Sequence, residues 1–435
     1  MKKVLFIGSL LVIAAQTVAA KNSERNAVWQ VIPVNSQMDI IDDNGNNKSI
    51  NPACAFDSLI NPATGEPVDN SFRFYFKQGK SKNLLVYFNG GGACWDDATC
   101  VASLAPSEVP GARPSYNPSI NEANSPEGAG GIFDDNNKRN PFKDWSKVFI
   151  PYCSGDIHIG TGEKLYSDVD GSVTGFPGAP VLVKHHGFDN FLAVREWLKQ
   201  NFATKSRYRS GKKNKKIKKL LVTGSSAGGY GATLNFPYLQ STFPKAESFM
   251  LADASQAVVT DGFIQDAFSF GNAWNIEEAL APIFLDTLGA YTFDQFNAQV
   301  YNIITTAYPH SRFAQYSTAN DLVQVQFLKI MDQLDRGNDE PNTWLLSLPD
   351  DGVYFAEWNF RMESSVDFIA ANTNNYQYYI GEGTVHTILT DAFATELIPQ
   401  PFYDEKSAGN LRFTRWLKRF VKSKRFPNQS VKYSD

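Results

Sequence analysis

The sequence contains few of the residues that build metal sites, and it has no long apolar segment after its first residues. Its 435 residues include only four cysteines and five histidines. No Cys-x-x-Cys pair or histidine cluster accompanies the cysteines, which argues against a zinc site. Beyond the N-terminus no stretch offers about 18 uninterrupted apolar residues, so a membrane span is not expected. The net charge is −4, from 41 basic and 45 acidic residues, and such a balance lacks the field that recruits nucleic acid.

The N-terminus has the pattern of a secretory signal. Lys2 and Lys3 precede an apolar stretch from Val4 to Ala15, and small residues follow at 18–20. This order of a basic, an apolar and a small-residue region is typical of a cleavable signal peptide. We therefore predict a signal peptide over residues 1–20 and a mature protein that is secreted or periplasmic.

The four cysteines follow the predicted signal and are an even number: Cys54, Cys94, Cys100 and Cys153. In an oxidising compartment, this predicts two disulfides. The short separation makes Cys94 with Cys100 the simplest pair and leaves Cys54 with Cys153, although the sequence allows three pairings.

No linker-like composition divides the rest of the chain, so residues 21–435 are expected to form a single domain. Apolar runs that suit buried strands recur along it at Leu84–Phe88, Val148–Tyr152, Leu220–Thr223, Phe249–Ala252, Phe313–Ser317 and Tyr376–Ile380. Helical patterns lie between several of them, most clearly at Phe191–Lys199 behind a possible Asp189 cap. Continuous apolar strands that alternate with helices predict an α/β fold, with a mostly parallel sheet and helices on both faces.

Two stretches interrupt this alternation and predict long loop insertions. Residues 104–143 are rich in Pro, Gly, Asn and Ser, and residues 254–300 are rich in Phe, Ala and Asn. Such excursions are either functional loops and lids or ordinary surface insertions. The second stretch contains aromatic residues that suit either an acyl channel or the core: Phe263, Phe268, Phe270 and Trp274.

A Gly-x-Ser-x-Gly motif provides the clearest chemical signal. Residues 220–228 are Leu-Leu-Val-Thr-Gly-Ser-Ser-Ala-Gly, in which a strand-like run leads directly into the motif. A nucleophilic serine at a sharp strand-to-helix turn needs small neighbours, which Gly224 and Gly228 supply. The alternative is a serine- and glycine-rich loop without a catalytic role. The preceding strand favours a nucleophile elbow with Ser226 as the nucleophile.

A serine hydroxyl needs a general base, and histidine is the usual one. Only His310 and His386 follow Ser226 in the chain. His386 lies just after the Tyr376–Ile380 strand in a glycine-punctuated loop, whereas His310 precedes its strand. In α/β-hydrolases the partners stand at the carboxyl ends of later strands, so His386 is predicted as the base.

The orienting carboxylate has two candidates. Asp253 ends the strand next after the nucleophile, and Asp321 follows the last strand before the histidine. The chain order serine, acid, histidine with the acid on the later strand favours Asp321. Asp253 remains the alternative, and its other role would be that of a structural or pocket carboxylate.

The oxyanion donors are expected from the loop after Leu84–Phe88, where Asn89-Gly90-Gly91-Gly92-Ala93-Cys94-Trp95 stands. Consecutive glycines let the N–H groups of Gly91 and Gly92 approach a substrate oxygen, and Ala227 supplies another. A phosphate loop is the competing interpretation, but the Gly-Lys-Ser/Thr ending is absent.

With these segments in place, the chain resembles the pectin acetylesterase and Notum family over roughly residues 50–390. The resemblance rests on the glycine loop with its cysteines, on Ile150-Pro151-Tyr152-Cys153-Ser154-Gly155-Asp156, on Gly224-Ser225-Ser226-Ala227-Gly228-Gly229 and on the late aspartate and histidine segments. It implies an α/β-hydrolase-like fold, a Ser226, Asp321 and His386 triad, and an oxyanion hole around Gly91, Gly92 and Ala227. The chain departs from the family pattern at Ala93, where many relatives have Trp.

Sequence and resemblance together predict a serine carboxylesterase that hydrolyses acyl esters, with acetyl on a polysaccharide as the expected substrate. The mechanism requires no metal or organic cofactor. A lipase or polyester depolymerase would use the same triad. A glycan-binding protein that retains the hydrolase scaffold without activity is the alternative from another class.

Overall fold

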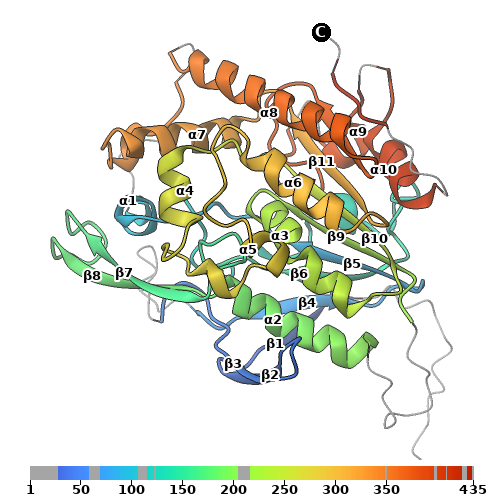
Figure 1. The fold of residues 1–435 in the computed structure, drawn as a ribbon, viewed down its shortest axis with the longest axis horizontal. Coiled ribbons are helices and arrows are strands. Elements are labelled where there is room, and N and C mark those ends of the chain that lie inside the picture. Colours follow the sequence, from blue (N-terminus) through green and yellow to red (C-terminus); the bar gives the residue numbers. More distant parts are fainter. Residues whose placement is uncertain are drawn as a thin grey trace, which may run out of the picture.

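A computed structural model of the protein describes residues 28–57, 69–105, 115–121, 124–203, 216–347, 350–395, 399–407, 409–423 and 429–433. The predicted signal peptide lies outside these residues. A central eight-stranded sheet dominates the described part (Figure 1). Its strands are β1 (Gln30–Pro33), β4 (Arg73–Lys77), β5 (Asn83–Phe88), β6 (Ser146–Ile150), β9 (Lys219–Ser225), β10 (Glu247–Asp253), β11 (Arg312–Thr318) and β12 (Tyr376–Gly381).

The strand order across the sheet is β1-β4-β6-β5-β9-β10-β11-β12. Strand β4 pairs antiparallel with both β1 and β6, and every pair from β6 to β12 is parallel. A mostly parallel sheet whose order reverses at β5 and β6 is the α/β-hydrolase-like arrangement predicted from the sequence. Its six parallel strands are the six apolar runs, with ends shifted by two residues or fewer.

Each parallel strand is buried on both faces. Along β5, Leu84, Val86 and Phe88 belong to one apolar cluster and Leu85 and Tyr87 to another. This alternation follows from the two-residue period of a strand. Neither face reaches water, which explains why the runs are continuously apolar instead of alternating.

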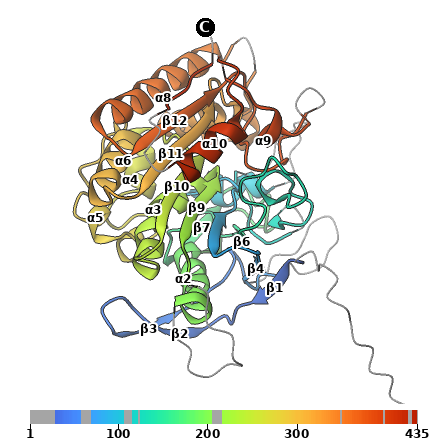
Figure 2. The same ribbon diagram turned by 90° about the vertical axis from the view of Figure 1, so that its right-hand side faces the viewer.

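The helices cover both faces of the sheet. They are α1 (Asp97–Cys100), α2 (Gly187–Leu198), α3 (Ala227–Thr242), α4 (Asp261–Ala267), α5 (Pro282–Leu285), α6 (Phe296–Ala307), α7 (Leu322–Asp335), α8 (Gly352–Asn372), α9 (Pro401–Asp404) and α10 (Phe413–Lys422). Figure 2 shows α3, α6 and α8 on one side of the sheet and α9 and α10 on the other. Apolar residues of α2, α3, α6 and α8 share the cluster of Val86, and those of α10 share the cluster of Leu85.

The sequence prediction of the cap of α2 is wrong. The N-cap is His186, and Asp189 lies in the first turn of the helix. The Asp189 carboxylate is buried and accepts a hydrogen bond from the N–H of Asn51 at 2.7 Å. The helix therefore begins earlier than its apolar periodicity indicates, and the aspartate stabilises a neighbouring segment.

Two hairpins stand outside the central sheet. They are formed by β2 (Met38–Ile41) with β3 (Asn47–Ile50) and by β7 (Gly162–Asp168) with β8 (Ala179–His185). Two disulfides, Cys54–Cys153 and Cys94–Cys100, confirm the pairing favoured from spacing. Among the described helices, none is both long enough and apolar enough to cross a membrane.

Candidate active site

Ser226 occupies the sharp turn between β9 and α3. Its backbone has φ 56° and ψ −129°, a conformation that an L-residue adopts only when its surroundings impose it. The N–H of Ser226 donates to the carbonyl of Asp253 at 2.8 Å, and its own carbonyl accepts from the N–H of Gly229 at 2.8 Å. The hydroxyl of Ser255 donates to the same carbonyl at 2.6 Å. These bonds hold Ser226 at the tip of a strand-to-helix elbow.

The glycines around Ser226 are required by close backbone approach. A Cβ at Gly224 would lie 2.1 Å from the carbonyl oxygen of Gly228, and one at Gly228 would lie 2.0 Å from that of Phe88. No side chain fits at such distances. The motif therefore lets α3 start directly against β5 and β9, with Ser226 facing the carboxyl end of the sheet.

His386 lies in the loop after β12, and its Nδ1 atom is 2.8 Å and 2.9 Å from the two carboxylate oxygens of Asp321. Because a carboxylate only accepts, Nδ1 is the donor in this contact. The ring is buried, and Nε2 has no hydrogen-bond partner among the described residues. His386 lines the same two cavities as Ser226. Nε2 is thus not engaged by another described residue, in a ring that shares both cavities with Ser226.

Asp321 is fully buried and is the N-cap of α7. Its Oδ1 atom accepts from the N–H groups of Val323 at 3.1 Å and Gln324 at 3.0 Å. The Gln324 side-chain amide also donates to Oδ2 at 2.9 Å. A helix N-terminus favours a negative charge, so α7 stabilises the carboxylate that orients His386.

The glycine loop after β5 presents unbonded N–H groups at the same place. Gly91 and Gly92 have φ of 158° and 77°, and their N–H groups donate to no described residue. Ala227 is the first residue of α3, so its N–H has no partner within the helix. Gly92, Ala227 and Ser226 line one apolar cavity. Gly91 lines the second cavity that Ser226 borders, so each of the three predicted donors shares a cavity with Ser226.

A buried histidine fixes this glycine loop. The Nε2 atom of His158 is 2.8 Å from the carbonyl oxygen of Asn89, so it must donate. Burial lowers the pKa of His158 to about 4, which keeps the ring neutral. The ring packs against Phe88 and Tyr152, with centroids 5.2 Å and 4.7 Å away. His158 therefore holds in position the glycine loop that carries the predicted donors.

Asp253, the alternative acid, makes different contacts. It accepts from the hydroxyl of Ser225 at 2.6 Å and from the N–H groups of Ile388 and Leu389 at 3.0 Å. Burial raises the pKa of Asp253 to about 6. The carboxylate hydrogen-bonded to the His386 ring is that of Asp321.

An apolar cavity of about 70 Å³ opens beside Ser226. By the same measure a single water needs roughly 10–15 Å³. Its lining is largely aromatic and aliphatic and includes Trp95, Val258, Phe263, Phe268, Phe327 and Trp358. The space is several times larger than an acetyl methyl group requires.

A second, larger cavity of about 410 Å³ is lined by Gly90, Gly91 and Gly92 of the glycine loop. Polar groups contribute much of its lining, including Asn89, Asn117, Asn124, Gln326, Thr387 and Thr390. Ser226 and His386 line both cavities. Ser226 thus lies where an apolar cavity and a more polar cavity meet.

The stretch 254–300 contributes to the apolar cavity. This stretch contains the aromatic residues Phe263, Phe268, Phe270 and Trp274. Phe263 and Phe268 line the cavity. Trp274 is buried and donates from its indole nitrogen to the carbonyl of Cys94 at 2.7 Å, while Phe270 is 63% exposed. The stretch is therefore part cavity wall and part core, and its exposed phenylalanine belongs to neither.

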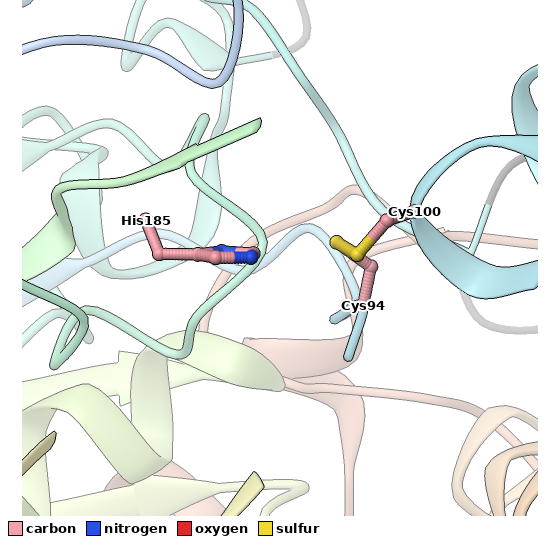
Figure 3. Close-up of side chains that lie close together, drawn as sticks. All are labelled: Cys94, Cys100 and His185. Carbon is pink, nitrogen blue, oxygen red and sulfur yellow. A yellow bond between two sulfur atoms is a disulfide. The ribbon is translucent and has the colours of Figure 1, made fainter. Parts of the chain in front are cut away.

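One cysteine and histidine cluster resembles a metal site by proximity alone. Cys94, Cys100 and His185 offer ligand atoms within 4.8 Å of one another (Figure 3). The two sulfurs form a disulfide. The His185 ring nitrogens are engaged at 2.9 Å by the carbonyl of Ser154 and the hydroxyl of Tyr166. These three residues therefore present no free thiolate or imidazole to a metal.

Besides His158, three further residues contribute to the site and were not predicted from the sequence: Gln324, Ser225 and Tyr87. Gln324 holds Asp321, and its Oε1 atom accepts from the N–H of Gln256 at 2.7 Å. Ser225 and Tyr87 are bonded to each other at 3.0 Å behind the nucleophile. Only Ser225 carried a signal, because it directly precedes Ser226 in the motif.

Comparisons with known proteins agree with the resemblance found from the motifs. The family model described as Pectinacetylesterase matches residues 69–184. The palmitoleoyl-protein carboxylesterase Notum of Schmidtea mediterranea is 30% identical over 167 residues, which are 38% of this chain and 26% of that protein. The chain thus matches about a quarter of this relative's length.

The crystal structure of the Wnt deacylase Notum from Drosophila aligns over 85% of this chain and 92% of its own, with a TM-score of 0.45 and 17% identity. The family model and the sequence relative agree with each other and with the glycine-loop and cysteine motifs. The matched segment 69–184 is thus similar to the Pectinacetylesterase family, and it contains the glycine loop and the cysteines Cys94, Cys100 and Cys153.

Proposed function

We propose that this protein is an exported serine carboxylesterase that releases an apolar acyl group from a polar alcohol. One observation carries the proposal. Ser226, at a strand-to-helix elbow, lines two cavities together with Gly92 and with His386, whose Nδ1 is held by the buried Asp321. The match of residues 69–184 to the Pectinacetylesterase model supports ester hydrolysis, and the name of the relative from Schmidtea mediterranea includes an acyl-protein ester as substrate.

In the proposed mechanism His386 acts through Nε2 and Asp321 through its contact with Nδ1. Nε2 accepts the proton of Ser226 as the hydroxyl oxygen attacks the ester carbonyl. The imidazolium that forms is stabilised by Asp321. The N–H groups of Gly91, Gly92 and Ala227 stabilise the oxyanion. His386 then protonates the leaving alcohol, and water enters by the same general-base step to release the acid.

The two cavities suggest where the acyl part and the alcohol part of the substrate bind. The apolar cavity of about 70 Å³ suits the acyl chain, because each buried methylene contributes about 0.8 kcal/mol. The larger cavity suits an alcohol with several hydroxyl or amide groups, since its asparagine and threonine side chains provide donors and acceptors. We therefore propose an acyl group longer than acetyl. Acetyl on a carbohydrate is the second candidate, favoured by the polar cavity and the family model.

Export is part of the proposal. The two disulfides favour an oxidising compartment, because thiols stay reduced in the cytosol. The sequence pattern of residues 1–20 supports a cleaved signal peptide. N-terminal sequencing of the exported protein is expected to begin near Lys21.

Hydrolysis of aryl acetate, butyrate and octanoate by the purified protein tests the proposal. We expect kcat/KM to rise at least tenfold from acetate to octanoate. Ser226→Ala should lower the rate by about 10⁴ or more, whereas the exposed Ser172→Ala should not. Val258→Phe fills the apolar cavity and should lower octanoate hydrolysis selectively, and Val353→Phe, at a position 66% exposed, is its control.

The outcomes separate the alternatives. A preference for acetate, with acetate released from an acetylated polysaccharide, would establish the second candidate. An unlabelled protein after long exposure to a fluorophosphonate, with glycan binding intact, would identify a non-catalytic binding protein. Retention of most activity in Ser226→Ala would refute the nucleophile assignment.

A further inference from the structure

Asp253 connects the two segments that carry the nucleophile and the base. It ends β10 and is fully buried. Its Oδ2 atom accepts from the Ser225 hydroxyl at 2.6 Å, and both carboxylate oxygens lie 3.0 Å from the N–H of Ile388. Oδ2 also accepts from the N–H of Leu389 at 3.0 Å. One side chain is therefore bonded to the residue before Ser226 and to the second and third residues after His386.

The network extends into the sheet. The Tyr87 hydroxyl donates to Ser225 Oγ at 3.0 Å, which places the ends of β5, β9 and β10 in one chain of hydrogen bonds. All three residues are buried. A buried network in which each donor has an acceptor holds its members in one arrangement.

Both segments that Asp253 holds contain a strained residue. Ser226 has φ 56° and follows Ser225 directly, and its N–H donates to the Asp253 carbonyl at 2.8 Å. Thr387 has φ 62° and stands between His386 and Ile388. Positive φ is costly for a β-branched residue and persists only where the surroundings impose it. The two N–H bonds to Asp253 are immediately beyond Thr387, so they impose its turn.

On the other side of Thr387 the chain is held by different groups. The His386 ring is bonded to Asp321, and the Thr318 hydroxyl donates to the carbonyl of Val385 at 3.0 Å. Thr387 is therefore fixed between two anchors, one on β11 and α7 and the other on β10. Loss of the β10 anchor leaves the orientation of His386 to the contacts made by Asp321 and Thr318.

We propose that Asp253 is a positioning residue that sets the placement of the His386 loop relative to the nucleophile elbow. This inference rests on the proposed esterase function. Asp253 acts through backbone N–H groups and through Ser225, and it takes no part in proton transfer. It differs from Asp321 in this respect, because Asp321 is bonded to the imidazole itself.

Substitutions at Asp253 should separate positioning from general stability. Asp253→Ala leaves two buried N–H groups without an acceptor, and we expect kcat to fall roughly 10²-fold with little change in KM for a small aryl ester. Asp253→Asn retains an oxygen for these N–H groups and should recover activity to within about tenfold of wild type. Asp189→Ala is the control, because that buried carboxylate also accepts a backbone N–H but lines neither cavity.

Wild-type kcat in folded Asp253→Ala would overturn the proposal, and so would a loss of activity equal to that of Asp189→Ala. If Asp253→Ala does not fold, Asp253→Asn and Ser225→Ala carry the test. Each should lower kcat several-fold with KM unchanged, and unaltered kcat in both would overturn it.

Amide hydrogen exchange tests the same contact without any substrate. In Asp253→Ala or Asp253→Asn, peptides that contain Ile388 and Leu389 should exchange faster, by roughly tenfold or more in the alanine variant. Peptides around Asn51 should change only in Asp189→Ala. Unchanged exchange at 388–389 overturns the positioning role. An inactive wild-type enzyme with faster exchange in the variant would instead refute the esterase function and retain the structural role.

Discussion

The carboxylate of Asp321 caps α7 through Oδ1 and contacts His386 Nδ1 through both oxygens. This double use allows catalysis and stability to be tested separately. An asparagine at this position keeps an oxygen for the Val323 and Gln324 N–H groups, and Asn caps helices about as well as Asp. Its amide nitrogen, however, disfavours a proton on His386 Nδ1. The ring would then carry its proton on Nε2, where it cannot accept one from Ser226.

We therefore expect Asp321→Asn to lower kcat by about 10⁴ while the free energy of unfolding stays within about 1 kcal/mol of wild type. Steady-state kinetics and urea unfolding measure the two effects. A variant with near wild-type kcat would remove Asp321 from the mechanism. A large loss of stability would mean that the cap is not preserved.

The pKa of Asp253, raised by burial from its ordinary 3.8 to about 6, makes a prediction about stability. The folded state binds the Asp253 proton more tightly than the unfolded state does. The resulting stabilisation of the folded state is fully present below pH 3.8 and is lost as pH rises through about 6. A shift of about two units corresponds to about 3 kcal/mol. Relative to Asp253→Asn, the wild type should therefore lose up to about 3 kcal/mol of unfolding free energy between pH 4 and pH 8.

Urea unfolding of both proteins at several pH values measures this difference. Other titrating groups are present in both proteins, so their contributions to the pH dependence cancel in the difference. One of them is Glu405, whose pKa burial raises to about 7. A difference that does not change with pH would contradict the prediction. A difference that grows in favour of the wild type at high pH would show that Asp253 is stabilised as an anion.

At the scale of elements, close approach of backbones determines where the nucleophile stands. Gly224 and Gly228 permit α3 to start against β5, and Gly90 allows the donor loop to pass Ser226, since a Cβ there would lie 2.9 Å from the serine Cβ. Three elements therefore meet at one point only because side chains are absent there. The same requirement makes the motif visible in the sequence.

The six parallel strands could be predicted because burial on both faces produces continuous apolar runs. Strands β1 and β4 were not predicted. β1 has four residues and only one that is even half-buried, so an edge strand of this kind has almost no hydrophobic pattern. The start of α2 was misplaced because Asp189, which resembles a cap, accepts its hydrogen bond from a distant segment.

The catalytic candidates could be predicted because each stands at a fixed place relative to a strand end. The supporting contacts could not. Gln324 reaches Asp321 from one turn into α7, and Asp253 binds N–H groups of a loop 135 residues away. Such contacts depend on the paths of loops, which no local pattern specifies. Whether Phe263 lines a cavity or fills the core was equally undetermined, since both roles require an apolar ring.

At the scale of the whole molecule, the two disulfides act on different distances along the chain. Cys54–Cys153 joins residues 99 positions apart, whereas Cys94–Cys100 closes a separation of six. In the chain-entropy model, a closed loop of about 100 residues stabilises by about 4.7 kcal/mol and a loop of six by roughly 2 kcal/mol. The long link should therefore matter more for stability. The short link lies beside the oxyanion loop, so it should matter more for catalysis.

We expect the double variant Cys54→Ala/Cys153→Ala to lose about 2–5 kcal/mol of unfolding free energy, with kcat little changed in the protein that remains folded. Cys94→Ala/Cys100→Ala should lose less stability but more kcat, because Cys94 is only two residues beyond Gly92 and its N–H is held at 2.9 Å by the carbonyl of Gly155. Urea unfolding and ester hydrolysis under non-reducing conditions measure both quantities. If the short link governed stability and the long link governed kcat, the oxyanion loop would be positioned by the connection between the N-terminal segment and β6 and not by its own disulfide.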